Sequence, residues 1–372
     1  MALRSGLASQ WGFKAEATWD TPVTVDTFLP LVSETMTREQ ERIESAGQFS
    51  GRRVLTSDQW ATGRNKVGGG IQSELYNKNI ATLISHMMGD ASSPYTPGDL
   101  AGFGLTMQFG VPDVSGTVQP KTYSGCKIEG WELACSEGEI ATLGLDVVAR
   151  REILHRTVAD GATNSNTTVT SATAAFTADD IGKPISGGTI PAGATITAVA
   201  SATSVTISAA ASGTATGVTL VTGIALASAS YTAGLQPVKF THGSVTIGGA
   251  SVKVKNARLS GKNGLDAERY FLGSNDRDEP HEADLREYMA DLDVEFTDLT
   301  QYRRYLNGTE HALVLTFTSG TTFSMVITTN VRFEGQTASV DGRGIIKQSL
   351  PMKCVASGAD STAISIALTE QS

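Results

Sequence analysis

The sequence predicts a mainly β protein with two similar units in tandem, each with a short flanking helix, and a small all-β module inserted between them. Three observations lead to this prediction. The 372 residues include 39 glycines and only 6% aromatic residues, a composition that favours β structure with frequent turns. One order of strand-like and helix-like patterns occurs twice along the chain. The middle of the chain differs from both flanks in composition.

The chain divides into three segments. We expect a first β-sandwich or barrel-like unit over residues 1–160, the inserted module over 161–223 and a second such unit over 224–372. The middle segment consists almost entirely of Ala, Gly, Ser, Thr, Val and Ile. A disordered low-complexity linker is one interpretation of it. We favour a folded module that projects from the surface, because apolar residues alternate in two runs and suit one core. These residues are Val205, Ile207, Val218 and Leu220.

A strand followed by a helix is predicted in the first unit. Residues 71–75 alternate apolar and polar side chains, as a half-buried strand does. Asn77 is the expected N-cap of the helix. Apolar residues then recur at helical spacing, and Gly89 ends the helix. The apolar face consists of Ile80, Leu83, Ile84, Met87 and Met88.

The same order occurs in the second unit. Residues 292–296 alternate in the same phase. Asp298 is the expected N-cap, with Gln301 three residues later, and Gly308 ends the helix. The apolar stripe consists of Leu299, Tyr302, Tyr305 and Leu306.

Further features follow in one order in both units. They are extended stretches at 105–110 and 311–318, short segments at 128–130 and 333–335, alternating strands at 143–149 and 350–356, and charged loops with arginines at 41–66 and 266–287. Chance similarity between β-rich segments explains any single match. The shared order of all these features favours an internal duplication.

The charge distribution argues against nucleic-acid binding. The net charge is −9, whereas modules that bind nucleic acids are usually basic. Residues 265–298 contain twelve acidic residues and three arginines, so this segment accounts for the whole excess. A solvated face is the simplest interpretation of such a run. No run of 18 apolar residues predicts a membrane span, and the first residues lack the apolar core of a signal peptide, so we expect neither.

The sequence contains no catalytic, metal-binding or cofactor-binding motif. It lacks a phosphate loop, a G-x-G-x-x-G segment and a G-x-S-x-G elbow. The histidines have no ligand spacing, and Cys126, Cys135 and Cys354 form no C-x-x-C pair. We therefore expect a protein that is not an enzyme, without metal or cofactor, whose cysteines serve as small buried hydrophobic residues.

Several short motifs follow one another in a characteristic order. The chain opens with GFKAEATWDTPV at 12–23 and FLP at 28–30, then has ERIE at 41–44, GRR at 51–53, GI…EL…G between 70 and 89, LGS at 272–274 and QSLP at 348–351. In this order the chain resembles the major tail tube proteins of long-tailed, siphovirus-like bacteriophages. The resemblance covers roughly residues 1–157 and 225–372. The inserted module departs from the basic pattern of that family.

The resemblance implies a structural protein of the virion tail. Tail tube subunits form rings that stack into a hollow tube, through which genomic DNA passes without specific binding. Strands of all subunits join into one barrel around the lumen, which removes open sheet edges. A ring commonly holds six units, so three chains of two units are expected, or six chains if the duplication is absent. A tape measure protein and a tail terminator are implied partners, and assembly is expected in the host cytoplasm without a membrane.

Four acidic residues are predicted to face the lumen. Basic side chains there would bind DNA phosphates, so a neutral or acidic wall suits transit. Asp291, Asp293 and Glu295 alternate with apolar residues and make one strand face acidic, and Glu74 holds the matching position in the first unit. The alternative is that these acids face solvent or the next ring.

Contacts between rings are predicted for two segments of opposite charge. The basic residues are Arg52, Arg53, Arg64 and Lys66, and the acidic residues are Asp276, Asp278 and Glu279. Single exposed ion pairs contribute about 0–1 kcal/mol, but repetition around a ring multiplies the effect.

Other functional classes remain open at this point. A carbohydrate-binding adhesin or another tail decoration protein would explain the β content and the Ser/Thr-rich insert, although Phe176 is the only aromatic residue there for stacking on sugars. A β-rich polysaccharide hydrolase would need two carboxylates placed in a cleft. Neither class explains why the strand and helix order occurs twice.

Overall fold

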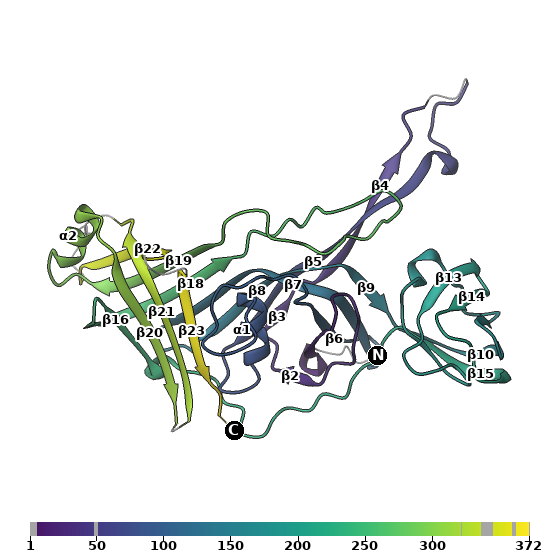
Figure 1. Cartoon of the computed structure of the whole chain (residues 1–372), viewed down its shortest axis with the longest axis horizontal. Coiled ribbons are helices and arrows are strands. Elements are labelled where there is room, and N and C mark those ends of the chain that lie inside the picture. Colours follow the sequence, from purple (N-terminus) through teal and green to yellow (C-terminus); the bar gives the residue numbers. More distant parts are fainter. Residues whose placement is uncertain (1–5, 48–50, 321, 336–344, 359–361, 372) are drawn as a thin grey trace.

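The computed structural model describes residues 6–47, 51–320, 322–335, 345–358 and 362–371. An elongated body of β strands carries two projections, which are a long hairpin and a separate small module (Figure 1). The helix α2 lies at one end of the body, and the module lies at the opposite end.

The first unit contains one α helix among antiparallel strands. Its elements are η1 (Gly6–Ala8), β1 (Gln10–Ala15), β2 (Thr27–Leu29), β3 (Ser33–Glu34), β4 (Thr37–Glu44), η2 (Ser57–Gln59), β5 (Trp60–Glu74), α1 (Ala81–Met88), β6 (Leu105–Pro112), β7 (Val118–Ser136), β8 (Thr142–Ala149) and β9 (Arg151–Leu154). The long strand β7 takes part in two sheets, because its first part pairs with β6 and β9 and its second part with β8.

The second unit has a similar set of elements. They are η4 (Phe240–His242), β16 (Gly243–Ile247), β17 (Ala250–Val252), β18 (Val254–Lys262), β19 (Glu287–Glu295), α2 (Thr300–Asn307), β20 (His311–Ser319), β21 (Phe323–Phe333), β22 (Lys347–Val355) and β23 (Ile364–Thr369). A long connection over residues 263–286 joins β18 to β19 without a strand of its own, as the sequence predicted.

The two units share one pattern of strand pairing. In the first unit β5 pairs with β4 and β8, and β7 pairs with β6, β8 and β9. In the second unit β19 pairs with β18 and β22, and β21 pairs with β20, β22 and β23. Each helix also contacts the corresponding strand, α1 on β7 and α2 on β21. The predicted tandem β architecture with two short helices is therefore confirmed.

One sheet runs through both units. The second part of β7 pairs with β18 from Gly130↔Lys262 to Ser136↔Asn256, so the strands β4, β5, β8, β7, β18, β19 and β22 are neighbours in that order. A single hydrophobic core also spans both units, from Trp11 and Phe13 to Ile366 and Leu368. Backbone pairing and a common core therefore make the two units one body.

The helix α1 begins later than the sequence predicted, and Asn77 does not cap it. The helix starts at Ala81, and the amides of Ile80 and Ala81 donate to the carboxylate of Glu370 at 2.6 and 2.9 Å. Asn77 is buried and instead binds Gln371 and the backbone of Gly234 and Gln236. A cap from the far end of the chain could not be read from the local pattern. All five predicted apolar residues of the helix are buried.

The helix α2 follows the predicted boundaries more closely. The amide of Thr300 donates to Asp298 at 2.7 Å, and Gly308 ends the helix in the left-handed conformation at φ +60°. Gly89 has the same role in α1, at φ +74°. None of the residues of α2 is fully buried, which the amphipathic pattern did not predict.

The inserted module is a separate six-stranded sheet with its own core. Its strands are β10 (Arg156–Asn164), β11 (Thr168–Thr170), β12 (Ile185–Ser186), β13 (Ile196–Ser201), β14 (Ser204–Ile207) and β15 (Thr214–Thr222), with η3 (Ala178–Asp180). Val205, Ile207 and Leu220 are buried in this core and Val218 packs against it, as the alternation predicted. Arg156 pairs with Thr222, so the module starts and ends at one place. The folded β module is confirmed, and the interpretation as a disordered linker is wrong.

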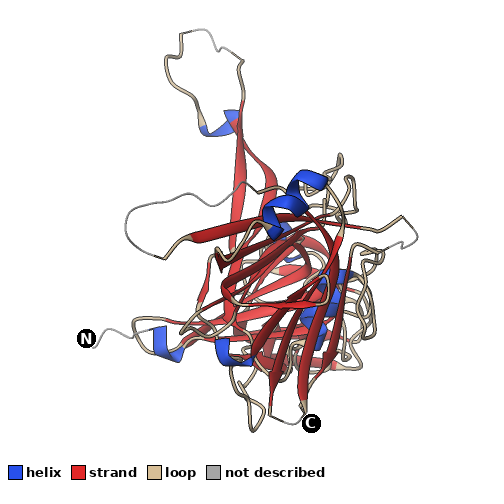
Figure 2. Cartoon of the chain, turned by 90° about the vertical axis from the view of Figure 1, so that its left-hand side faces the viewer, coloured by secondary structure: helices blue, strands red, loops and turns tan. Residues whose placement is uncertain are grey.

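The described parts of the segment 41–66 belong to a hairpin rather than to the predicted loop. Residues 37–44 and 60–68 pair as the antiparallel strands β4 and β5, and Figure 2 shows this hairpin extending well beyond the body. All side chains of β4 are exposed or half-buried, so no apolar alternation marks this strand in the sequence.

Candidate functional site

The sheet that joins the two units has one face on the core and one open face. Along β19 the buried residues alternate with exposed ones, and Ala290, Leu292 and Val294 lie in the core. The open face therefore carries the side chains that a lumen or a partner would meet. Its polar and charged residues include Gln72, Glu74, Glu132, Asp146, Arg258, Lys262, Glu287, Asp291, Asp293, Glu295, Ser349 and Lys353.

Three of the predicted lumen acids lie together on β19, but basic and neutral groups surround them. Glu295 forms an ion pair with Lys255 at 3.0 Å. Asp291 accepts a hydrogen bond from Ser349 at 2.9 Å, and Asp293 accepts one from Asn256 at 3.4 Å. Two more ion pairs, Lys353–Glu287 and Arg258–Glu132, lie on the same face. The sequence showed the acids of one strand, but neighbouring strands make the face mixed in charge.

Glu74 lies on the same open face, at the other side of the sheet. Three strands separate Glu74 from Asp291. The paired residues on these strands are Thr142, Ala134 and Arg258. Glu74 therefore does not contact the acids of β19. Its carboxylate accepts the hydroxyl of Tyr76 at 2.7 Å.

The predicted basic residues are divided between the tip and the base of the hairpin. Arg52 and Arg53 are exposed near the tip. At the base, Arg64 forms ion pairs with Glu41 at 2.8 Å and with Glu268 at 3.1 Å, and Lys66 lies 3.5 Å from Glu268. Charges of opposite sign therefore already meet within one chain at the base of the hairpin.

The predicted acidic residues lie in the connection 263–286, which packs on its own chain. Asp276 accepts a hydrogen bond from Asn65 at 2.7 Å, and Glu279 forms an ion pair of 2.7 Å with the buried Lys127. Burial lowers the pKa of Lys127, and the nearby Glu279 opposes this shift. Asp278 lies 4.0 Å from Arg269 in the same connection. Asp276 and Glu279 therefore hold the connection against β5 and β7, a role that their spacing did not reveal.

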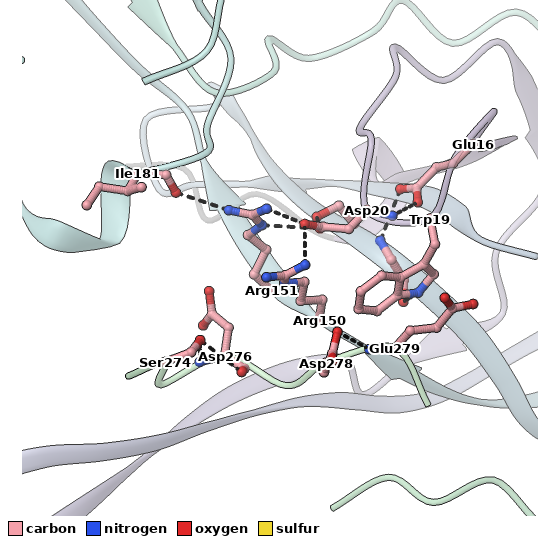
Figure 3. A network of polar contacts seen from close by, with 12 residues as sticks. Glu16, Trp19, Asp20, Arg150, Arg151, Ile181, Ser274, Asp276, Asp278 and Glu279 are labelled. Atoms are coloured by element: carbon pink, nitrogen blue, oxygen red, sulfur yellow. Dashed lines mark hydrogen bonds and ion pairs between the residues drawn. The ribbon is translucent and has the colours of Figure 1, made fainter. Parts of the chain in front are cut away.

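A polar network centred on Asp20 lies where the body meets the module (Figure 3), and the ion pair Arg38–Asp179 at 2.7 Å also links the two. The carboxylate of Asp20 is nearly inaccessible and binds Arg150 at 3.2 Å, Arg151 and Ser124. Arg151 also donates to the carbonyl of Ile181 in the module at 3.0 Å. The amide of Asp20 in turn donates to Glu16, whose pKa burial raises. Both acids come from the opening motif at 12–23, and Asp20 of that motif holds Arg151, which reaches the module.

The part of the chain with described positions contains no cluster of three or more His, Cys, Asp or Glu residues suited to a metal ion. None of the described helices is long and apolar enough to cross a membrane. The three cysteines carry free thiols, and Cys126 and Cys354 are buried.

Comparison with protein families agrees with this geometry. The chain matches the family of phage tail tube proteins over residues 6–209 and again over 186–354, so the matches together reach both units. Among curated proteins, none matches the chain. The chain therefore belongs to the phage tail tube protein family, and it is a structural component of the virion tail.

Proposed function

We propose that this chain forms rings that stack into the hollow tail tube of a long-tailed phage, through which the genomic DNA enters the host cell. The observation that carries the proposal is the joint between β7 and β18, where two similar units share one sheet. Such a joint repeats if the next unit is added in the same way, and a closed ring leaves no open sheet edge.

The unit boundaries expected from the sequence, near residues 160 and 223, suit this ring. The strand β4 of the first unit corresponds to β18 of the second, yet among the described residues β4 pairs only with β5. We propose that this open edge of β4 joins the second unit of the next chain, as β18 joins β7 within one chain. Three chains with two units each then close a ring of six similar units.

The open face of the shared sheet is the proposed wall of the lumen. Glu74, Asp291, Asp293 and Glu295 lie on this face together with paired lysine and arginine residues. A basic side chain with a carboxylate partner attracts a DNA phosphate less strongly than an isolated one, because the partner offsets its charge. The mixed wall therefore suits passage of DNA without specific binding.

The projecting hairpin is the proposed contact between stacked rings. Arg52 and Arg53 lie near its exposed tip, and the connection that carries Asp276, Asp278 and Glu279 lies at its base. Contacts from tip to base between successive rings are head-to-tail and produce a filament. A tape measure protein inside the tube and a tail terminator at its end are the proposed partners, with assembly in the host cytoplasm. We expect no enzymatic activity and no cofactor.

Electron microscopy of the purified recombinant chain tests the ring and the tube. We expect hollow tubes of stacked rings, with threefold symmetry and six similar lobes in each ring. True sixfold symmetry would contradict two units per chain. A monomer that does not polymerise at high concentration, even with added tail terminator or tape measure protein, would contradict the assembly.

Charge reversal in the lumen tests the role of the open face. We expect slower DNA ejection from virions with Asp293→Lys and Glu295→Lys, because unpaired lysines would bind phosphates. The matched control is Thr197→Lys with Thr203→Lys, two exposed positions of the module. Normal tails with an unchanged ejection rate in the first variant would show that these acids do not face the DNA.

A further inference from the structure

The two helices occupy corresponding places in their units but differ in burial. Ile80 and Met87 of α1 are 0 and 2% exposed. The corresponding residues Leu299 and Leu306 of α2, which likewise precede the C-cap glycine by nine and two residues, are 47 and 61% exposed. Tyr305 of α2 is 38% exposed as well. An apolar helix face that is covered in one unit is thus uncovered in the other.

The second unit contacts both ends of α1. Glu370 accepts the amides at the start of α1, and Asn263 donates to the carbonyl of Met87 at 3.0 Å near its end. Arg286 donates to the carbonyl of Met88 at 2.8 Å. The loop after α1 adds a backbone bridge between Tyr95 and Ile366 of β23. The first unit therefore contributes a buried helix whose two ends the following unit holds.

We propose that α2 docks against the first unit of a second copy of this chain. The exposed apolar residues of this helix are Leu299, Tyr305 and Leu306, and Tyr302 beside them is half-buried. This proposal rests on the proposed ring, because it extends the joint between the two units of one chain to the joint between two chains. The helix lies at one end of the elongated body and β9 lies toward the other, so a head-to-tail neighbour brings them together (Figure 1).

The partner surface includes β9, which corresponds to β23. The strand β9 pairs with β7 and β23 pairs with β21, in each case along the edge opposite β6 or β20. Their burial also corresponds, since Ile153 and Ile366 are buried. The exposed Leu154 of β9, at 50%, offers an apolar contact for α2. Each end of the body therefore has an exposed apolar residue to bury.

The composition of α2 suits a surface that is exposed to solvent in the unassembled chain and buried after assembly. Arg303 and Asn307 stand where α1 carries Ile84 and Met88. Interfaces that form from folded partners mix polar residues with apolar anchors, whereas a permanent core does not. Tyr and Leu side chains beside arginine give α2 this mixed character.

The test compares assembly with stability in the full-length chain. We expect Leu299→Lys with Leu306→Lys to leave the thermal unfolding midpoint of the unassembled chain unchanged and to raise the concentration needed for ring formation at least about tenfold, because apolar anchors dominate such interfaces. Thr197→Lys with Thr203→Lys is the matched control, since it adds the same two charges at exposed positions of the module. We expect this control to assemble normally.

The outcomes separate this inference from the proposed function. Rings of wild-type chain together with normal assembly of the double variant would overturn the docking of α2 and leave the tube intact. A double variant that unfolds at a clearly lower temperature would also overturn it, because the face would then belong to the core of the chain. Failure of the wild-type chain to form rings would instead refute the proposed function. In an averaged map of the tube, density of a neighbouring first unit on α2 supports the inference, and solvent there contradicts it.

Discussion

The two units of this chain share a strand pattern and differ in what completes them. In the second unit, β18 has a neighbour on both sides, whereas its counterpart β4 pairs among the described residues only with β5. Conversely, α1 is buried and α2 is exposed. The difference teaches that a strand edge or helix is covered where the other unit lies beside it. The edge of β18 and the helix α1 lie at the joint between the units, whereas β4 and α2 lie away from it.

The largest expected effect tests the contrast between the helices directly. We expect Leu83→Ala in α1 to lower the free energy of unfolding by about 2–5 kcal/mol, because Leu83 is fully buried and leaves a cavity. Leu306→Ala in α2 should change it by about 0.5 kcal/mol or less, as for other surface positions. Urea unfolding of the unassembled chain measures both. Equal losses of unfolding free energy in the two variants would contradict the difference in burial between α1 and α2.

A smaller effect is expected for the cap that crosses between units. Glu370→Ala removes the acceptor of the amides of Ile80 and Ala81 and should cost about 1–2 kcal/mol of unfolding free energy. Asp298→Ala at the start of α2 should cost less, because water can reach the exposed amide of Thr300. Thermal unfolding of the two variants, compared with wild type, sharpens the contrast. A larger loss for Asp298→Ala would contradict it.

The smallest expected effect is a dependence on pH that comes from α1. Burial lowers the pKa of His86 from its ordinary value of 6.5, and its ring nitrogens face the carbonyls of Thr82 and Gly104. The folded chain therefore takes up a proton less readily than the unfolded chain. The contribution of His86 to stability is complete above pH 6.5 and is lost as the pH falls toward the lowered value.

His86→Gln should thus flatten the fall in unfolding free energy between pH 7 and pH 5. The measurement is urea unfolding at both pH values for the variant and for wild type. His155 and His311 also have lowered pKa values but remain in both proteins, so their effect cancels. A steeper fall in the variant would show that His86 is protonated in the folded chain.

Local patterns predicted much of the fold because they repeat at the period of the element they form. The buried stripe of α1, the alternation along β19 and the two helix-ending glycines were all readable in this way. The strand β4 was missed, since a strand without a buried face leaves no alternation to read. Asn77 was assigned as a cap in error because the true cap, Glu370, lies 289 to 290 residues from the amides that it accepts.

The candidate site was only partly predictable for a similar reason. The acids of β19 are adjacent in sequence and could be found, but Lys255, Arg258 and Lys353, which balance the face, come from strands distant in sequence. In the same way, the spacing of Asp276 and Glu279 gave no sign that Asn65 and Lys127 bind them.

The sequence by itself determined the β class, the tandem order of the elements and the presence of a foreign module, because each follows from composition or from a short-range period. Only the tertiary structure decided which edges and faces are covered. Coverage depends on segments that approach from far along the chain, as β18 approaches β7 and Glu370 approaches α1. Such pairings are set by the packing of the whole body, since a strand edge or a helix end has the same local pattern whether a partner reaches it or not.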